Sequence, residues 1–328
     1  MKVLVTGASG MLGRGTARAL IDRGDEVTVL QRRPAGLPAA EVLADIGAPA
    51  DRAAVERAAR GQDAVVHLAA KVDVVGRWAD YERINMGGTR AVLAACRAAG
   101  VRRLIHVSSP SVAHAGRPLA GVAAEPADPV AARGNYARSK AMAEVEALAA
   151  DSVELAVLVV RPHLVWGPGD TQLVDRVVSR AAAGRLPLIG SGAALIDTTY
   201  VDNAVDALVA AVEACGPVHG EALVVSNGEP RPVAEVLARL CRAAGVAGPR
   251  GRLPYPLARL AGAAIECGWA AARRSETPPL TRFLAEQLAT AHWFDQRRTR
   301  EALSWTPRIT LDRAFDALAR SYATRVAH

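Results

Sequence analysis

The chain has 328 residues, of which 51% are hydrophobic and 22% are charged; this balance predicts one large or two modest folded domains and excludes a disordered chain. Its 40 basic and 33 acidic side chains give a net charge of +7, but the arginines are spread along the sequence among few aromatic residues, so we expect no nucleic-acid partner. Four scattered cysteines without a C-x-x-C pair argue against a disulfide framework or a zinc site, and no uninterrupted apolar run is long enough to span a membrane. We therefore expect a cytoplasmic protein that binds no metal.

Short β-branched runs alternate with longer helical runs through the first half of the chain. The runs at residues 2–6, 26–30, 64–68, 104–108 and 153–160 are nearly all apolar, as strands buried on both faces of a parallel sheet are. Helical periodicity occupies residues 12–23, 52–59, 81–99 and 136–150. This alternation predicts an α/β fold with a doubly wound parallel sheet, in a first domain over residues 1–165.

The pattern changes after residue 165. A helix is predicted near residues 172–183, and a short strand at 198–201 with a helix at 202–214 is expected to rejoin the sheet, within residues 197–226. The remainder of 166–328 is predicted to form a smaller, mostly helical substrate-binding lobe, because Pro and Gly repeatedly break its helical segments. The stretch 253–272 is apolar but is interrupted by Arg259 and Glu266. Two interpretations of it stay open: a helix that covers a ligand cavity, or a helix that associates peripherally with a membrane.

Three glycines follow the first strand and open the first helix. Gly7, Gly10 and Gly13 permit a tight turn and let the main chain approach a pyrophosphate at the helix N-terminus. This position after an N-terminal strand favours a dinucleotide cofactor over a turn that merely uses glycine.

The residues after the second strand bear on which cofactor is bound. Gln31 stands where an acid would bind the ribose hydroxyls of NAD, and Arg32 or Arg33 would pair with the 2′-phosphate of NADP. We therefore expect NADP, with NAD as the alternative. Asp45, after the third strand, either accepts from the adenine amino group or holds a turn.

Tyr136 and Lys140 lie four residues apart in a predicted helix and project from one face. A nearby ammonium lowers the pKa of a phenol, which makes the phenol a usable proton relay. Ser109 follows the fifth strand, where its hydroxyl would hold a substrate oxygen beside the phenol. The sequence lacks a G-x-S-x-G elbow, which argues against a serine hydrolase.

In order and spacing over roughly residues 1–215, these motifs resemble the extended short-chain dehydrogenase/reductase superfamily. The segments 67–70, 161–162 and 167–170 fit the same pattern. The resemblance implies a Rossmann fold in which Ser109 orients the reacting carbonyl or hydroxyl, Tyr136 is the acid/base, and Lys140 lowers the pKa of Tyr136 and holds the nicotinamide ribose. Asn85 matches a further catalytic position of the family. Cofactor contacts are expected at Gly7, Ser9, Gly10, Met11, Leu12, Gly13, Arg32, Arg33, Asp45, Ile46, Leu68, Ala69, Ala70, Lys71, Ser108, Tyr136, Lys140 and Pro162.

Further segments are similar to the 3β-hydroxysteroid dehydrogenase-like branch of this superfamily, and within it to bacterial 2-alkyl-3-oxoalkanoate reductases. They are residues 108–114, 277–283, 291–295 and 303–307. The resemblance implies an NADP(H)-dependent ketoreductase or alcohol dehydrogenase that acts on a hydrophobic ketone or secondary alcohol, of 3-oxoacyl or steroid-like type. We expect a homodimer, with Ser111, His114, His163 and Trp166 near the substrate.

Two other functions stay open. A nucleotide-sugar epimerase or dehydratase uses the same scaffold, but a dehydratase would show an acidic pair where Pro110 and Ser111 stand, and an epimerase favours an acid at position 31. A non-enzymatic NADP-sensing regulator would show a degraded active site, whereas Tyr136 and Lys140 are both present.

Overall fold

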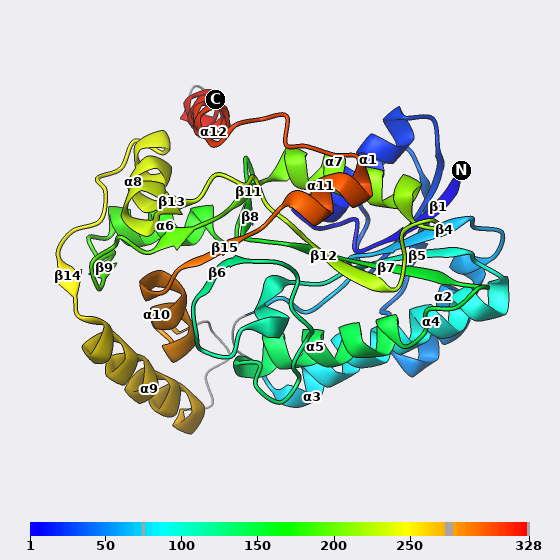
Figure 1. Ribbon diagram of the computed structural model, residues 1–328, viewed down its shortest axis with the longest axis horizontal. Coiled ribbons are helices and arrows are strands. Elements are labelled where there is room, and N and C mark those ends of the chain that lie inside the picture. Colours follow the sequence, from blue (N-terminus) through cyan, green and yellow to red (C-terminus); the bar gives the residue numbers. More distant parts are fainter. Residues whose placement is uncertain (74–75, 273–277, 327–328) are drawn as a thin grey trace.

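The computed structural model describes residues 1–73, 76–272 and 278–326. Its centre is a seven-stranded sheet (Figure 1) in which every strand pairs in parallel with its neighbours. The doubly wound Rossmann-type fold predicted from the sequence is confirmed. From one edge to the other the strands are β12 (Glu221–Val225), β7 (Ala156–Pro162), β5 (Arg103–Val107), β4 (Ala64–His67), β1 (Lys2–Thr6), β2 (Glu26–Gln31) and β3 (Ala40–Leu43).

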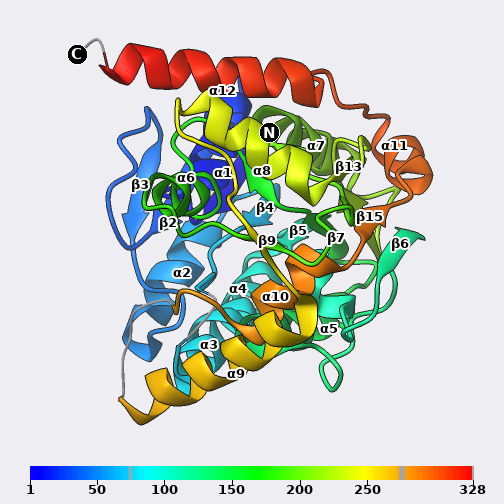
Figure 2. The same ribbon diagram turned by 90° about the vertical axis from the view of Figure 1, so that its left-hand side faces the viewer.

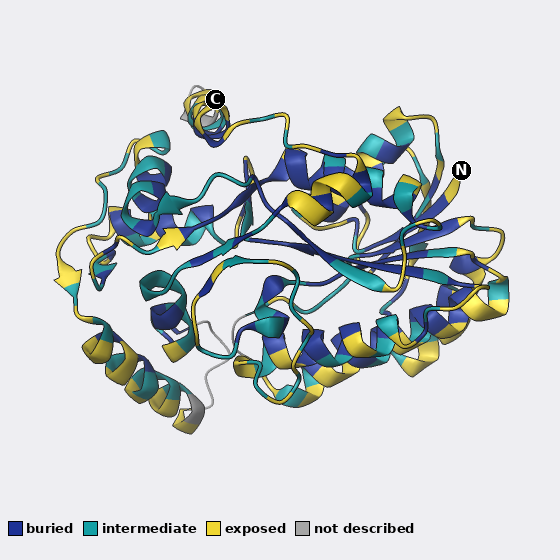
Figure 3. Ribbon diagram, viewed as in Figure 1, coloured by how far each residue is buried: buried dark blue, intermediate teal, exposed yellow. Residues whose placement is uncertain are grey.

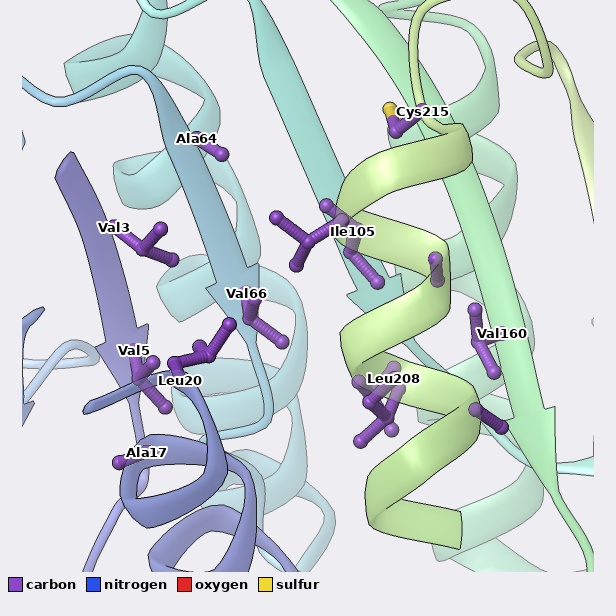
Figure 4. Close-up of a cluster of buried hydrophobic side chains, with 14 of the residues drawn as sticks. Val3, Val5, Ala17, Leu20, Ala64, Val66, Ile105, Val160, Leu208 and Cys215 are labelled. Carbon is purple, nitrogen blue, oxygen red and sulfur yellow. The ribbon is translucent and has the colours of Figure 1, made fainter. Parts of the chain in front are cut away.

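Helices cover both faces of this sheet because its strands are apolar on both sides. Helices α1 (Met11–Asp22), α7 (Val201–Ala214) and α11 (Arg297–Leu303) lie on one face, and α2 (Arg52–Ala59), α4 (Gly88–Ala99) and α5 (Gly134–Leu148) lie on the other (Figure 1). Figure 4 shows Leu20 of α1 and Leu208 of α7 among buried valines and Ile105 of the strands. The two apolar layers hold the carboxyl ends of the strands at one edge.

The helix expected over residues 81–99 is divided into three parts. A short helix α3 (Trp78–Tyr81) runs into the π-helical segment η2 (Glu82–Gly87), which continues into α4. A π-helical turn holds one more residue than an α-helical turn, and such turns occur frequently at functional sites. The segment carries Asn85, which is buried.

The second lobe contains helices and a sheet of short strands. Its helices are α6 (Val174–Ala182), α8 (Val233–Ala243), α9 (Tyr255–Ala271), α10 (Arg282–Ala289) and α12 (Leu311–Val326). A four-stranded sheet of β13 (Arg231–Pro232), β10 (Leu195–Ile196), β15 (His292–Phe294) and β6 (Leu119–Val122) accompanies them. Two further pairs join β14 (Arg252–Leu253) to β9 (Leu188–Ile189) and β11 (Thr199–Tyr200) to β8 (Val165–Trp166).

The segment 197–226 returns to the central sheet as expected, but the expectation for its first strand was wrong. The short strand expected at 198–201 does form, as β11, but it pairs with β8 and does not rejoin the central sheet. The side chain of Thr199 explains its place, because Thr199 Oγ1 donates to the carbonyl oxygens of His163 (2.6 Å) and Val225 (3.1 Å). Strand β12 joins the central sheet instead, beside β7.

Two views place the helices of the second lobe relative to the sheet. Helix α12 packs against α8, and α9 packs against α10 and projects from the body of the molecule (Figure 2). Figure 3 shows the central strands mostly buried, whereas α9 keeps a largely exposed outer face that includes Leu257 and Leu260. None of the helices in the described part of the chain combines the length and hydropathy needed to cross a membrane.

Candidate active site

A cavity of about 1550 Å³ opens along the carboxyl ends of the central strands and extends between the helices of the second lobe. Its walls include Leu30, Leu68, Val107 and Pro162 from the sheet side. Ligands of open α/β sheets bind at this edge. The volume exceeds the ~300–1,000 Å³ that is usual for one small ligand, so the cavity has room for two ligands side by side.

The glycine turn forms one end of the cavity, and all six residues expected there line it: Gly7, Ser9, Gly10, Met11, Leu12 and Gly13. Gly7 has a φ of +80°, and a Cβ on it would lie 2.8 Å from the Ala69 nitrogen. A Cβ on Gly13 would lie 2.3 Å from the Gly7 carbonyl oxygen. Helix α1 has no side-chain N-cap and no acid in its first turn. Its first N–H groups are therefore open to an anion, and the cradle fits the pyrophosphate of a dinucleotide.

The end of β2 separates the two arginines considered for cofactor selection. Arg32 lines the cavity, whereas Arg33 is exposed and does not line it. Gln31 is buried and donates from Nε2 to Glu41 Oε1 (2.6 Å). Of the two guanidiniums, Arg32 alone borders this part of the cavity.

Asp45 and Ile46 line the same part of the cavity. Asp45 Oδ1 accepts from the Gly47 N–H (2.9 Å) and Oδ2 accepts from Arg83 (3.0 Å). Burial acts to raise the pKa of Asp45, but these hydrogen bonds and the charges of Arg83 and Arg32 lower it overall. Asp45 thus holds its own turn and remains a carboxylate at the cavity wall, so both roles considered from the sequence fit its position.

Leu68, Ala69, Ala70 and Lys71 follow β4 and also line the cavity. Asn85, which the family resemblance assigns to the catalytic group, does not itself line the cavity. Asn85 Oδ1 accepts from the Lys71 N–H (2.7 Å), and its Nδ2 donates to Ser139 Oγ (2.9 Å) and to the Lys71 carbonyl oxygen (3.1 Å). Asn85 therefore ties the loop after β4 to α5.

Ser109, Tyr136 and Lys140 come together at the middle of the cavity and all three line it, as does Ser108. Tyr136 and Lys140 lie on α5, and the phenol shares a hydrogen bond with Ser109. Lys140 Nζ donates to the Val107 carbonyl oxygen at the end of β5 (2.7 Å).

The electrostatics of this group differ in one respect from the sequence expectation. Burial raises the pKa of Tyr136, and the hydrogen bond from Ser109 opposes that shift. Burial also lowers the pKa of Lys140 to about 8, so its ammonium is protonated at neutral pH. The net shift at Tyr136 is upward because the cost of burying a phenolate exceeds the help that the phenolate receives from its neighbours.

Ser111, His114 and His163 line the half of the cavity that faces the second lobe, where the substrate was expected. Pro162, which was expected to contact the cofactor, lines the cavity from the sheet side. Trp166 does not: it is fully buried, stacks on Phe315, and donates from Nε1 to Thr198 Oγ1 (3.0 Å). Its placement near the substrate was wrong, since the alternation of β8 turns its side chain into the core of the second lobe.

Several lining residues were not singled out from the sequence. Three apolar positions on α8, part of α10 and His292 on β15 belong to this wall. Only His292 and Phe283 fall in segments used above, 291–295 and 277–283, and both segments were used for their resemblance only; the α8 positions had no such signal. Thr277, which begins the segment 277–283, lies outside the described residues. The lining residues concerned are Val236, Leu237, Leu240, Phe283, Leu284, Gln287, Leu288 and His292.

Residues 3–226 match the family model of the NAD dependent epimerase/dehydratase family. The chain belongs to this family. Its 2-alkyl-3-oxoalkanoate reductase relative from Stenotrophomonas maltophilia is 40% identical over 332 residues, which cover 98% of this chain and 100% of the relative. The 3β-hydroxysteroid dehydrogenase/Δ5→4-isomerase of Mycobacterium tuberculosis is 30% identical over 333 residues, which cover 95% of this chain and 88% of that protein.

The chain shares its fold with solved structures. MoeE5 in complex with UDP-glucose and NAD superposes over 100% of both chains with a TM-score of 0.75 at 24% identity. At that identity the likeness concerns the fold alone. Relatives of this chain are named as reductases and dehydrogenases. The chain is therefore an oxidoreductase of the extended short-chain dehydrogenase/reductase type.

Proposed function

We propose that the chain is an NADP(H)-dependent ketoreductase whose substrate is a hydrophobic 3-oxo acid, in the manner of the 2-alkyl-3-oxoalkanoate reductases. The observation that carries the proposal is the meeting of Ser109, Tyr136 and Lys140 between the glycine cradle and the apolar wall of the second lobe. The 40% identity to a relative of that name over its whole length supports the substrate class. Arg32 at the cavity wall supports the phosphorylated cofactor.

The chain's own groups would handle the proton and the oxygen of the reaction. A bound nicotinamide dinucleotide supplies hydride to a carbonyl carbon or accepts it from an alcohol carbon. Tyr136 gives its phenolic proton to the ketone oxygen as that oxygen gains charge, while the Ser109 hydroxyl holds the same oxygen. The Lys140 ammonium, fixed by the Val107 carbonyl, stabilises the phenolate that remains. In the oxidative direction the proton returns to the phenolate.

A nucleotide-sugar epimerase is the second candidate, and one observation favours it. Arg176 and Arg180 of α6 line the cavity, and arginines pair well with a diphosphate. Against it stand the apolar side chains of α8 and α10 on the facing wall, which offer a sugar nucleotide few hydrogen-bonding groups.

The test is the oxidative reaction, because 3-hydroxy acids are stable whereas 3-oxo acids lose CO₂. Purified protein is given NADP⁺ or NAD⁺ with a long-chain 2-alkyl-3-hydroxy acid, a 3β-hydroxysteroid or a UDP-sugar. We expect NADPH to form with the hydroxy acid, and Tyr136→Phe to lower that rate by ~10²–10⁴-fold. Tyr255→Phe removes a hydroxyl away from the cavity and serves as the control. Conversion of the UDP-sugar alone to its epimer, with no net change in the cofactor, would refute the proposal in favour of the epimerase.

A further inference from the structure

Two histidines of the substrate half form a hydrogen-bonded pair at the cavity wall. His163 follows β7 and His292 begins β15, and both line the cavity. His163 Nε2 lies 2.8 Å from His292 Nδ1, and His292 Nε2 lies 2.7 Å from the carbonyl oxygen of Gln287. The rings meet edge to face with their centroids 4.9 Å apart, and both side chains are buried.

The Gln287 carbonyl, at the end of this row of hydrogen bonds, determines which ring nitrogens carry a hydrogen. A carbonyl oxygen only accepts, so His292 Nε2 carries a hydrogen, and in a neutral ring its Nδ1 is then an acceptor. His163 Nε2 must therefore donate to it, which leaves a lone pair on His163 Nδ1. That nitrogen has no hydrogen-bond partner among the described residues, and it is not enclosed by protein as both nitrogens of His114 are. The pair thus presents an unprotonated nitrogen to the cavity.

One added proton changes what the pair can bind. Protonation of His163 Nδ1 breaks neither the His163–His292 nor the His292–Gln287 hydrogen bond, because Nε2 of both rings already donates. It converts the free acceptor into a charged donor, which suits a carboxylate. Burial holds the pKa of His163 well below its ordinary value and that of His292 to about 4. The proton therefore arrives only when an anion arrives with it.

The other charged and titratable groups around the pair do not supply that anion. His114, at the end of the turn Pro110–Ala113, acts on both rings, and burial lowers its own pKa. Glu286 of α10 and Arg133 act on His114 with opposite signs. Asp197, beyond β10, accepts from Ser226 Oγ (2.5 Å) rather than from either histidine of the pair. Among the described residues these three histidines do not form a metal site.

We propose that the His163–His292 pair binds the carboxylate of the acid substrate and takes up one proton as it does so, the proton lying between His163 Nδ1 and a carboxylate oxygen. This rests on the proposed function, since it assigns the site that recognises the acid group. The consequence is a substrate that binds with a proton. Its apparent affinity should fall tenfold per pH unit wherever the free pair is neutral and the acid ionised.

The experiment compares a 2-alkyl-3-hydroxy acid with its methyl ester in the oxidative reaction between pH 5.5 and 8.5. We expect the KM of the acid to rise close to tenfold per pH unit in wild type, while the KM of the ester stays nearly constant. The ester shares the hydride and Tyr136 steps, so the difference between the two substrates reports the carboxylate alone. Parallel KM profiles of acid and ester in wild type would overturn the proposal without any variant.

Variants assign the proton to one ring. His163→Gln should remove the pH slope of the acid KM and raise that KM at pH 6, so that the acid and ester KM profiles become parallel. His219→Gln, at an exposed histidine paired with Asp151, should keep the wild-type slope. A slope that survives His163→Gln, or that disappears only in His114→Gln, would contradict the assignment. No turnover of acid or ester would instead refute the proposed function.

Discussion

Replacing Arg32 by Ala should weaken NADP(H) binding selectively, and Arg33→Ala should not. The two guanidiniums are neighbours in sequence and both exposed, but Arg32 alone lines the cavity. The charge of Arg32 also lowers the pKa of Asp45, which places it toward the wall between β2 and β3. The pair of variants therefore removes the same charge from the chain at two positions, of which one is at the site.

The size of the effect follows from the exposure of Arg32. Hydrogen bonds to charged groups are worth about 1.5–3 kcal/mol, and screening at an exposed site favours the lower end of that range. A loss of about 1.5 kcal/mol corresponds to roughly a tenfold rise in the Kd of NADPH, with the Kd of NADH unchanged. Fluorescence titration of both cofactors measures the ratio, and added salt should shrink the difference. Equal losses in Arg32→Ala and Arg33→Ala, or an unchanged NADPH/NADH ratio, would refute the reasoning.

Three further predictions concern packing and burial. Gly13→Ala places a Cβ 2.3 Å from a backbone oxygen and should lower Tm and cofactor affinity together. Gly268→Ala, in helix α9 with open space around it, should leave cofactor affinity unchanged and should not lower Tm, because Ala favours a helix more than Gly does. Glu144→Gln leaves the buried guanidinium of Arg161 without a carboxylate partner and should cost about 3–5 kcal/mol in urea unfolding. A loss below about 1 kcal/mol would contradict this. Since burial lowers the pKa of Lys140 from 10.5 to about 8, its ammonium destabilises the fold by up to about 3 kcal/mol below pH 8, a cost that fades toward pH 10.5. Lys140→Met should therefore abolish turnover yet raise Tm at pH 7, with a smaller gain at pH 9.5.

The central sheet was predictable because each of its main strands carries its own signal. The apolar runs that became β1, β2, β4, β5 and β7 are long enough for composition to identify them. The sheet of the second lobe was not predicted, since strands such as β10 and β13 have two residues each and no period to detect. Their partners also lie far away in sequence: Ile196 of β10 pairs with His292 of β15.

The candidate site divides in the same way. Tyr136 and Lys140 share one helix, so their spacing alone places them on one face. His163 and His292 lie 129 residues apart and meet only through the second sheet, so no local pattern announces the pair. Trp166 was wrongly placed near the substrate because it lies close to Pro162 in sequence. That closeness does not determine on which side a two-residue strand carries each side chain.

The place of β12 in the chain has a consequence for how the protein is made. The ribosome releases β7, which ends at Pro162, and then the 58 residues from 163 to 220 before β12 begins at Glu221. At ~5–20 residues per second, the flank of β7 that β12 will cover stays bare for roughly 3–12 s. That edge runs from Leu158 to Pro162, and Leu158, Val159 and Val160 are fully buried in the finished molecule. An unpaired, apolar strand edge promotes aggregation. Synthesis of this chain should therefore depend on chaperones during those seconds, and slower translation between residues 163 and 220 should lower the yield of folded enzyme.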